Sequence, residues 1–573
     1  MVTIEINGRP FEAQSGEMLL QTLRRAGVQV PTLCHLEGLL PSGACRMCVV
    51  EIEGQRGLIP SCAYPVTQPA KVHTHSARAV LARRTIVELL LANHPDDCLY
   101  CVRNQECQLQ ELVQQLGVRQ RRYAGEKSRH FLDMSSPSIV REPSKCVLCG
   151  KCVRVCEELQ GVGCIDFIGR GSRAKIGTAF DDGLNVSGCI NCGQCVVVCP
   201  TGALAERSHI PEVLAALRDP RKRVVVQHAP AVSVTVGEAF GLPAGADVAG
   251  AMTGALRRLG FDHVFDTSFT ADLTIMEEAS ELVHRLQHGG RLPMLTSCSP
   301  GWIKFVETYY PDYIGNLSTC KSPQQMMGAV IKSYFAQRQQ VDPQNIYSVS
   351  IMPCTAKKFE AARPEMARDG VADIDAVLTT RELVQLLHMH GLDLAEVPSE
   401  DADTPFGERT TAGKLFGASG GVMEAAIRTA HWMVTGRELE AFTVDAVRGL
   451  DGVKQASVNV DGLTLNVAVV SGLGSACRVL DEIRGGRNDL HFIEVMTCSG
   501  GCIGGGGQPH GADLDAVRKR MQGLYELDRQ GTVRTSHSNA SVQRLYDEFL
   551  GQPLGHLSHE LLHTHYAPRE MLA

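Results

Sequence analysis

Cysteines in short, regular spacings are the residues of this chain with the clearest chemical meaning. The chain has 22 cysteines, and in a large protein without an evident export signal such clusters indicate metal ligands rather than disulfides. CVLCGKCVRVC and CINCGQCVVVCP each hold cysteines separated by two, two and three residues, the bacterial run that binds [4Fe–4S] clusters. Because the fourth cysteine of each run ligates the other cluster, two ligand sets are expected: Cys146, Cys149, Cys152 and Cys199, and Cys189, Cys192, Cys195 and Cys156.

Two further groups of ligand-type residues precede these runs. Cys34, Cys45, Cys48 and Cys62 have the spacing of a plant-type [2Fe–2S] site. The strands expected at 2–6 and 10–13, followed by a helix, favour iron–sulfur over the alternative of tetrahedral zinc. After a helix expected at 79–92 comes a four-ligand set for which zinc is again an alternative: His94, Cys98, Cys101 and Cys107. Four one-electron centres before residue 210 indicate an electron path.

Beyond residue 210, cysteines follow short apolar runs that are expected to form buried strands. Cys298 lies in LTSCSPGW, Cys354 in IMPCTAKKFE, and Cys498 and Cys502 in EVMTCSGGCIGGGGQP. In α/β proteins, ligands bind beyond the carboxyl ends of the sheet strands. A run of glycines also lets the backbone approach a ligand closely. A metal-cluster site is therefore predicted here. The remaining cysteines are expected to be small buried hydrophobes: Cys164, Cys320 and Cys477.

Length and composition indicate how many domains position these residues and what class of protein the chain belongs to. The chain of 573 residues, 44% hydrophobic and 21% charged, is expected to form three or four domains. A net charge of −7 argues against a nucleic-acid partner. No apolar run of about 18 residues suggests a membrane helix, so a cytoplasmic location is expected.

Three segments carry a close resemblance. TSCSPGW, MPCTAKKFE and EVMTCSGGCIGGGGQP resemble the signature segments of the [FeFe]-hydrogenase catalytic domain. With the amino-terminal sites, the resemblance covers essentially the whole chain and is to the long clostridial type. It implies four domains: a plant-type ferredoxin domain with a β-grasp fold (1–78), a His/Cys₃ [4Fe–4S] domain (79–126), a two-[4Fe–4S] ferredoxin domain (127–209) and an H-cluster domain (210–573). The expected fold is an α/β catalytic domain, with mixed sheets flanked by helices and the active site between two lobes, preceded by α+β ferredoxin-like domains.

The resemblance also implies roles for individual residues. Cys354, Cys498 and Cys502 would ligate the [4Fe–4S] part of an H-cluster, and Cys502 would bridge to a two-iron unit carrying CO, cyanide and azadithiolate. Lys357 would pair with a cyanide, because an ammonium is a compact cationic donor. The pocket would be completed by Pro230, Pro323, Gln324, Met352 and Met496. A proton relay would run through Cys298, Glu278, Ser318 and Glu281.

One residue departs from the family pattern. The familiar relatives have two adjacent cysteines in the first segment, whereas this chain has Cys298 followed by Ser299. A serine oxygen is a harder ligand than a thiolate. Three arrangements remain open: Ser299 ligates through oxygen, the iron takes another ligand, or Cys298 ligates and shortens the relay. Ser299 is the expected ligand.

The predicted function is reversible interconversion of H₂ with protons and electrons. The alternatives are an electron-conduit subunit of a larger NAD(P)-linked complex, which leaves the carboxy-terminal cysteines unexplained, and a hydrogen sensor or iron–sulfur assembly factor. No nucleotide-binding glycine motif is evident, so the electron partner is expected to be ferredoxin or a diaphorase-type subunit. Dedicated maturation proteins would supply the two-iron unit.

Overall fold

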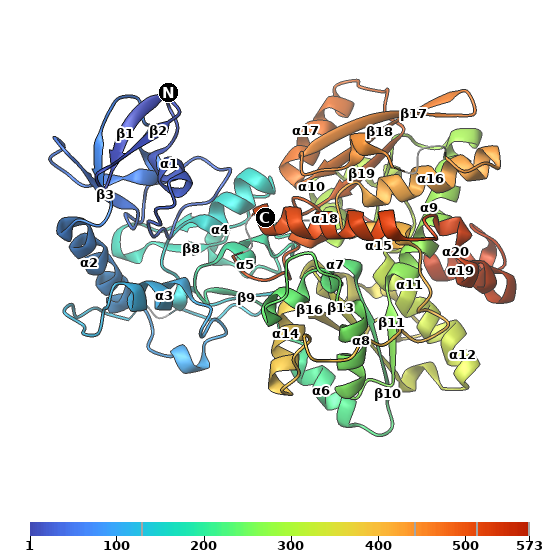
Figure 1. Ribbon diagram of the computed structural model, residues 1–573. Coiled ribbons are helices and arrows are strands. Elements are labelled where there is room, and N and C mark those ends of the chain that lie inside the picture. Colours follow the sequence, from blue (N-terminus) through green and yellow to red (C-terminus); the bar gives the residue numbers. More distant parts are fainter. Residues whose placement is uncertain (128–129, 440–442, 512–513, 571–573) are drawn as a thin grey trace.

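The computed structural model describes residues 1–127, 130–439, 443–511 and 514–570. In Figure 1 the amino-terminal part, blue to cyan, lies to one side of a larger carboxy-terminal part, green to red. Among the described residues, no helix is both long and apolar enough to cross a membrane.

The first unit is a five-stranded sheet in the order β2-β1-β5-β3-β4. The turn between the first two strands uses the positive φ angles of Asn7 and Gly8. Alternating apolar residues of the strands and of helix α1 (Leu19–Arg25) bury one face of the sheet. The strands are β1 (Val2–Ile6), β2 (Arg9–Ala13), β3 (Val49–Ile52), β4 (Ile59–Pro60) and β5 (Lys71–His73).

The next two units are small and built around cysteine loops. Helix α2 (Ala77–Asn93) begins at the cap Ser76, whose side chain accepts a hydrogen bond from Ala79 N. A turn at Cys98–Tyr100 and helix α3 (Gln108–Gln115) follow. Two strand pairs and two short helices form the third unit: β6 (Ile139–Arg141) with β9 (Leu204–Glu206), β7 (Asp166–Ile168) with β8 (Lys175–Gly177), α4 (Lys151–Arg154) and α5 (Gln194–Val198).

The carboxy-terminal part contains a first sheet that is wholly parallel, in the order β11-β10-β13-β16. Its strands are buried along nearly their whole length because helices cover both faces. The strands are β10 (Arg223–His228), β11 (His263–Asp266), β13 (Ile346–Met352) and β16 (Ala376–Thr379). The flanking helices are α6 (Ile210–Arg218), α8 (Ala249–Arg258), α14 (Thr380–Met389) and α11 (Pro323–Val330).

The second sheet has the order β12-β19-β18-β17, and its last pair is antiparallel. Its strands are β12 (Met294–Leu295), β17 (Val453–Val460), β18 (Leu463–Ser471) and β19 (Phe492–Met496). It is covered by α10 (Pro300–Tyr309), α16 (Gly421–Thr435) and α17 (Leu473–Arg484). Helix α9 (Ser268–His288) packs on α16 and on α11, and α18 (Leu514–Gln530) runs between the two sheets in Figure 1.

Two sequence expectations differ in detail from this architecture. The mixed strand directions occur in the second sheet, whereas the first sheet is parallel throughout. In the sequence, the apolar run VVVQHAPAV (224–232) predicts one buried strand, but the strand ends at His228 because Pro230 occupies the first position of helix α7 (Pro230–Ser233).

Candidate functional site

One cavity collects the residues implied for the catalytic site. It lies where strands of both sheets end, β13 before Cys354 and β19 before Cys498. Its lining is almost entirely apolar apart from thiols and a few polar groups. Every predicted pocket and cube residue lines it: Pro230, Cys298, Ser299, Pro323, Gln324, Met352, Cys354, Lys357, Met496, Cys498 and Cys502.

The glycine run is required by close backbone packing around this cavity. A Cβ on Gly505 would collide with the carbonyl oxygen of Pro353, and a Cβ on Gly506 with that of Cys192. The first contact holds the run against the loop of Cys354. The second holds it against the loop of the preceding ferredoxin-like unit, so the glycines join the cysteine loops of two units.

Ser299 lies beside the three cysteines but is already hydrogen-bonded. It precedes helix α10 at the N-cap position, without a side-chain capping hydrogen bond, and it lines the cavity. Its Oγ is 2.7 Å from Thr497 Oγ1. A hydroxyl oxygen has two lone pairs, so Ser299 Oγ can keep this hydrogen bond to Thr497 and still offer a lone pair to a metal.

Lys357 is a buried cation held in place at the cavity wall. Its Nζ is 2.9 Å from Glu360 Oε2 and 3.2 Å from the carbonyl oxygen of Cys298. Gln324 donates to the same Glu360 oxygen at 3.0 Å. A fixed ammonium in an apolar cavity suits a small anionic group.

The predicted relay residues lie along helix α9 and the loop beside it. Ser318 Oγ donates to Glu281 Oε2 at 2.9 Å. Glu278 is fully buried, and its oxygens accept no hydrogen bond of normal geometry from the residues that the structure describes. Burial, with the nearby Glu281 charge, raises the pKa of Glu278 to about 8. Burial also raises the pKa of the Cys298 thiol, and Glu278 adds to this effect. Both groups therefore hold protons at neutral pH.

The structure places each of the two interleaved cysteine sets around its own cavity. One cavity is lined by Cys146, Cys149, Cys152 and Cys199. The other is lined by Cys156, Cys189, Cys192 and Cys195, together with Cys164. Cys164 is only partly buried and its Sγ is 3.6 Å from Cys156 Sγ, so it is not the simple core residue that we expected. Cys320 is fully buried, and Cys477 is partly buried.

At the first of the two earlier sites the structure pairs the predicted cysteines, and at the second it leaves a histidine nitrogen free of hydrogen bonds within the described part of the chain. The side chains of Cys34 and Cys45 contact each other, as do those of Cys48 and Cys62. His94 ends helix α2, and its Nδ1 is buried without a hydrogen-bond partner among the described residues. A buried ring nitrogen with no partner is suited to metal binding. Cys98 and Cys101 flank the following turn, and Cys107 begins helix α3.

Residues that the sequence did not single out connect the ferredoxin-like unit to the cavity. Gln194 lies between Cys192 and Cys195, and its Nε2 donates to Cys498 Sγ at 3.1 Å and to Gly504 O at 2.9 Å. Arg381 Nη2 donates to Gly506 O at 2.9 Å and to Glu206 Oε2 at 2.8 Å.

These links cross more than a hundred residues of sequence. No local spacing pattern could have indicated them.

Comparisons with known proteins agree across the chain. The family model "Iron only hydrogenase large subunit, C-terminal domain" matches residues 222–506, and "Iron hydrogenase small subunit" matches 514–569. Models of a 2Fe-2S iron-sulfur cluster binding domain, an NADH-ubiquinone oxidoreductase-G iron-sulfur binding region and a 4Fe-4S dicluster domain match 1–77, 83–122 and 145–203.

Relatives and solved structures give the same result. The chain is 47% identical to an NADP-reducing hydrogenase subunit of Solidesulfovibrio fructosivorans, over 100% of both chains. It is 39% identical to iron hydrogenase 1 of Clostridium pasteurianum, over 99% of this chain and 100% of that one. An apo [FeFe]-hydrogenase structure from Chlamydomonas reinhardtii is 44% identical, with a TM-score of 0.58, and covers 63% of this chain and 99% of that one. With family models matching its amino-terminal iron–sulfur domains and its carboxy-terminal part, the chain belongs to the iron-only hydrogenase family and is an oxidoreductase of H₂.

Proposed function

We propose that this chain interconverts H₂ with protons and electrons at an H-cluster whose cube is held by Cys354, Cys498 and Cys502, with Ser299 at the fourth position. The observation that carries the proposal is the convergence of these side chains on one apolar cavity together with Lys357. The donor set fits the group: soft thiolates for iron, a fixed cation for cyanide, and glycines that bring the backbone close. When bound, the two-iron unit would supply the redox chemistry that cleaves H₂.

The protein residues hold the site dry and remove the proton. Apolar walls that include Met352 and Met496 exclude water. Cys298 is the first proton carrier, and Glu278 receives the proton from it. Because the Glu278 pKa is about 8, its carboxyl can both hold and release a proton near neutral pH. Ser318 then passes the proton to Glu281, to which its hydroxyl is already hydrogen-bonded.

The electron path would use one [2Fe–2S] and three [4Fe–4S] clusters on the cysteines and histidine described above. One apolar cluster contains Cys34, Cys107 and Cys149, one residue from each of three proposed sites. The second ferredoxin-like site would then pass electrons to the cube across the contact that Gln194 makes with Cys498. This contact favours an active hydrogenase over a mere electron conduit, because it leads into the cavity.

The electron partner is proposed to be a separate diaphorase-type subunit that handles NAD(P), with ferredoxin as the alternative. The relative at 47% identity is itself named an NADP-reducing hydrogenase subunit. Under H₂, the matured chain alone should reduce viologen but not NADP⁺. Reduction of NADP⁺ by the chain alone would contradict this assignment.

The ligand set is tested by alanine variants of the chain produced with the H-cluster maturation proteins. Cys354→Ala and Cys498→Ala should lose H₂ evolution from reduced viologen and the electron paramagnetic resonance signal of the cube. Cys477→Ala is the matched control, because it removes a partly buried cysteine outside the proposed sites and should retain both. Normal turnover by Cys498→Ala would overturn the proposal.

A further inference from the structure

The proposed relay reaches Glu281, and the cation bonded to this carboxyl cannot carry a proton further. Glu281 is 8% exposed. Arg285 Nη2 donates to Glu281 Oε1 at 2.5 Å and to the carbonyl oxygen of Leu317 at 2.7 Å. A guanidinium stays protonated in proteins, so Arg285 holds the carboxylate in place but does not accept its proton. The Glu281 proton must therefore pass either to water at its exposed edge or to another protein group.

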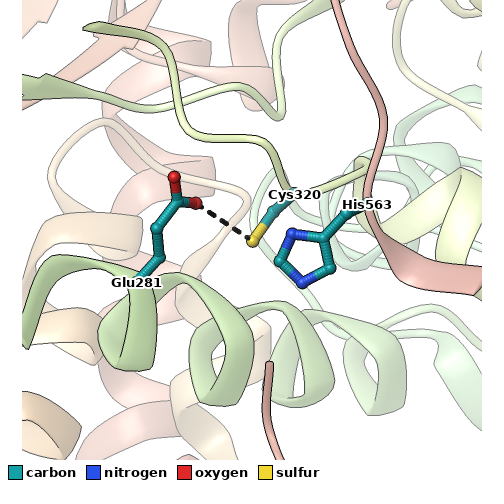
Figure 2. A group of neighbouring side chains, drawn as sticks. All are labelled: Glu281, Cys320 and His563. Carbon is teal, nitrogen blue, oxygen red and sulfur yellow. Dashed lines mark hydrogen bonds between the residues drawn. The ribbon is translucent and has the colours of Figure 1, made fainter. Parts of the chain in front are cut away.

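A buried histidine lies one hydroxyl away from Glu281. Thr319 Oγ1 is 3.3 Å from Glu281 Oε2 and 2.8 Å from His563 Nδ1. Figure 2 shows the Cys320 sulfur lying between the Glu281 carboxylate, on helix α9, and the His563 ring, from the carboxy-terminal segment. The side chains of His563 and of its neighbour Cys320 are both buried.

Glu277 orients this ring. Its Oε2 is 3.1 Å from His563 Nε2, and it also accepts hydrogen bonds from Leu554 N at 2.9 Å, from Tyr546 OH at 2.5 Å and from the Ser558 hydroxyl. Burial alone would raise the pKa of Glu277. These hydrogen bonds, of which the one from His563 has the largest effect, instead hold the pKa below its usual value. An anionic Glu277 keeps a proton on Nε2 and leaves the Nδ1 lone pair facing Thr319.

A metal ion bound by Glu281, Cys320 and His563 is the competing interpretation. One ligand atom from each lies within 4.8 Å of the others. However, Glu281 already accepts hydrogen bonds from Ser318, Thr319 and Arg285, and both ring nitrogens of His563 have partners. Burial, with the Glu281 and Glu278 charges, raises the pKa of the Cys320 thiol well above its usual value, so the sulfur stays protonated. The geometry therefore favours a hydrogen-bond network.

We propose that His563 is a further proton carrier, reached from Glu281 through the Thr319 hydroxyl and positioned by Glu277; this rests on the proposed function. During H₂ oxidation the O–H bond of protonated Glu281 breaks and its proton goes to Thr319 Oγ1. The original Thr319 proton moves to His563 Nδ1, and the resulting imidazolium is paired with the Glu277 carboxylate. The His563 ring stacks on His559, which is exposed, with 4.7 Å between ring centroids. His563 thus lies one residue from solvent.

Two variants of Thr319 separate the proton step from folding. Thr319→Val removes the hydroxyl at nearly constant volume, whereas Thr319→Ser keeps it. At saturating reduced viologen, the valine variant should lose about tenfold or more in the rate of H₂ evolution, with a larger solvent isotope effect and an unchanged KM for viologen. The serine variant should stay within about twofold of the wild type. Infrared bands of CO and cyanide confirm equal maturation.

A second pair of variants tests the role of Glu277. Glu277→Gln removes the charge that stabilises the imidazolium, so the basic limb of the pH–rate profile should move to lower pH. Tyr546→Phe removes another hydrogen bond to Glu277 and should leave the profile in place. The other titratable groups that face His563, namely Glu281, Cys320 and His559, are the same in both variants, so they do not account for a difference between the two profiles.

Three results would overturn the proposal. The first is a wild-type rate and isotope effect in Thr319→Val. The second is an equal loss in the serine and valine variants. The third is one equivalent of zinc retained by the wild type after desalting but not by His563→Gln, which would assign a metal site instead. Gas production by the wild-type protein in the same assay tests the proposed hydrogenase function independently of the role of His563.

Discussion

Glu278→Gln should stabilise the folded protein at alkaline pH and at the same time abolish proton transfer. The carboxyl is fully buried, and its pKa rises from 4.5 to about 8. Below pH 4.5 Glu278 is protonated in both the folded and the unfolded state, so its ionisation does not change the free energy of unfolding. Between pH 4.5 and 8 only the unfolded state ionises, and stability falls as pH rises. Glutamine carries no ionisable proton and escapes this loss.

The size of the effect follows from the shift. Each pKa unit corresponds to about 1.4 kcal/mol, so the gain of Glu278→Gln should grow from about 2 kcal/mol at pH 6 to an upper limit of about 5 kcal/mol at pH 8. Calorimetric unfolding of wild type and variant at both pH values, with matched cluster content, measures the growth. H₂ evolution by the variant should be lost.

Glu281→Gln on the same helix is the matched control. It weakens the ion pair with Arg285 and should cost about 1–3 kcal/mol. Glu278 is not a buried proton carrier with a raised pKa if its glutamine variant shows the same stability difference at pH 6 and pH 8, or if that variant turns over H₂ normally.

Three further predictions concern the cube and its link to the ferredoxin-like unit. Ser299→Cys should change the electron paramagnetic resonance spectrum of the cube while keeping turnover; an unchanged spectrum would mean that residue 299 is not a ligand. Gln194→Leu removes the hydrogen bond to Cys498 Sγ and should lower the reduction potential of the cube by about 20–60 mV, taking about 0.5–1.4 kcal/mol for the bond; a potential equal to that of the wild type argues against this contact. Arg381 outweighs burial to hold the pKa of Glu206 at about 2, so this contribution to stability is present above pH 4.5 and is lost as pH falls toward 2. Arg381→Met should therefore cost about 3–5 kcal/mol at neutral pH, and a calorimetric loss below 1 kcal/mol would contradict it.

The cysteine pattern predicted much of the site because ligand spacing is local. The two interleaved runs line separate cavities in the predicted combination, and the strand-end positions of Cys354 and Cys498 follow from short apolar runs. The limits of elements were less predictable. The strand before Pro230 ends at His228, because the proline begins a helix.

Tertiary contacts between distant segments were beyond sequence reasoning. Gln194 reaches Cys498 only because two loops pack backbone against backbone. His563 lies in a carboxy-terminal segment that carries no ligand spacing, and its meaning depends on Glu277 and Thr319 being folded against it. Cys164 is similar, since its nearness to Cys156 comes from a turn and not from the ligand run.

Cys354, Cys498 and Cys502 are proposed to hold an H-cluster that turns over H₂. Its most direct test is the rate of H₂ evolution from reduced methyl viologen by the matured chain, with the infrared spectrum recorded on the same sample. An H-cluster held by these cysteines should give steady gas production together with CO and cyanide bands. Intact bands without gas production would contradict it and would indicate a hydrogen-sensing member of the family.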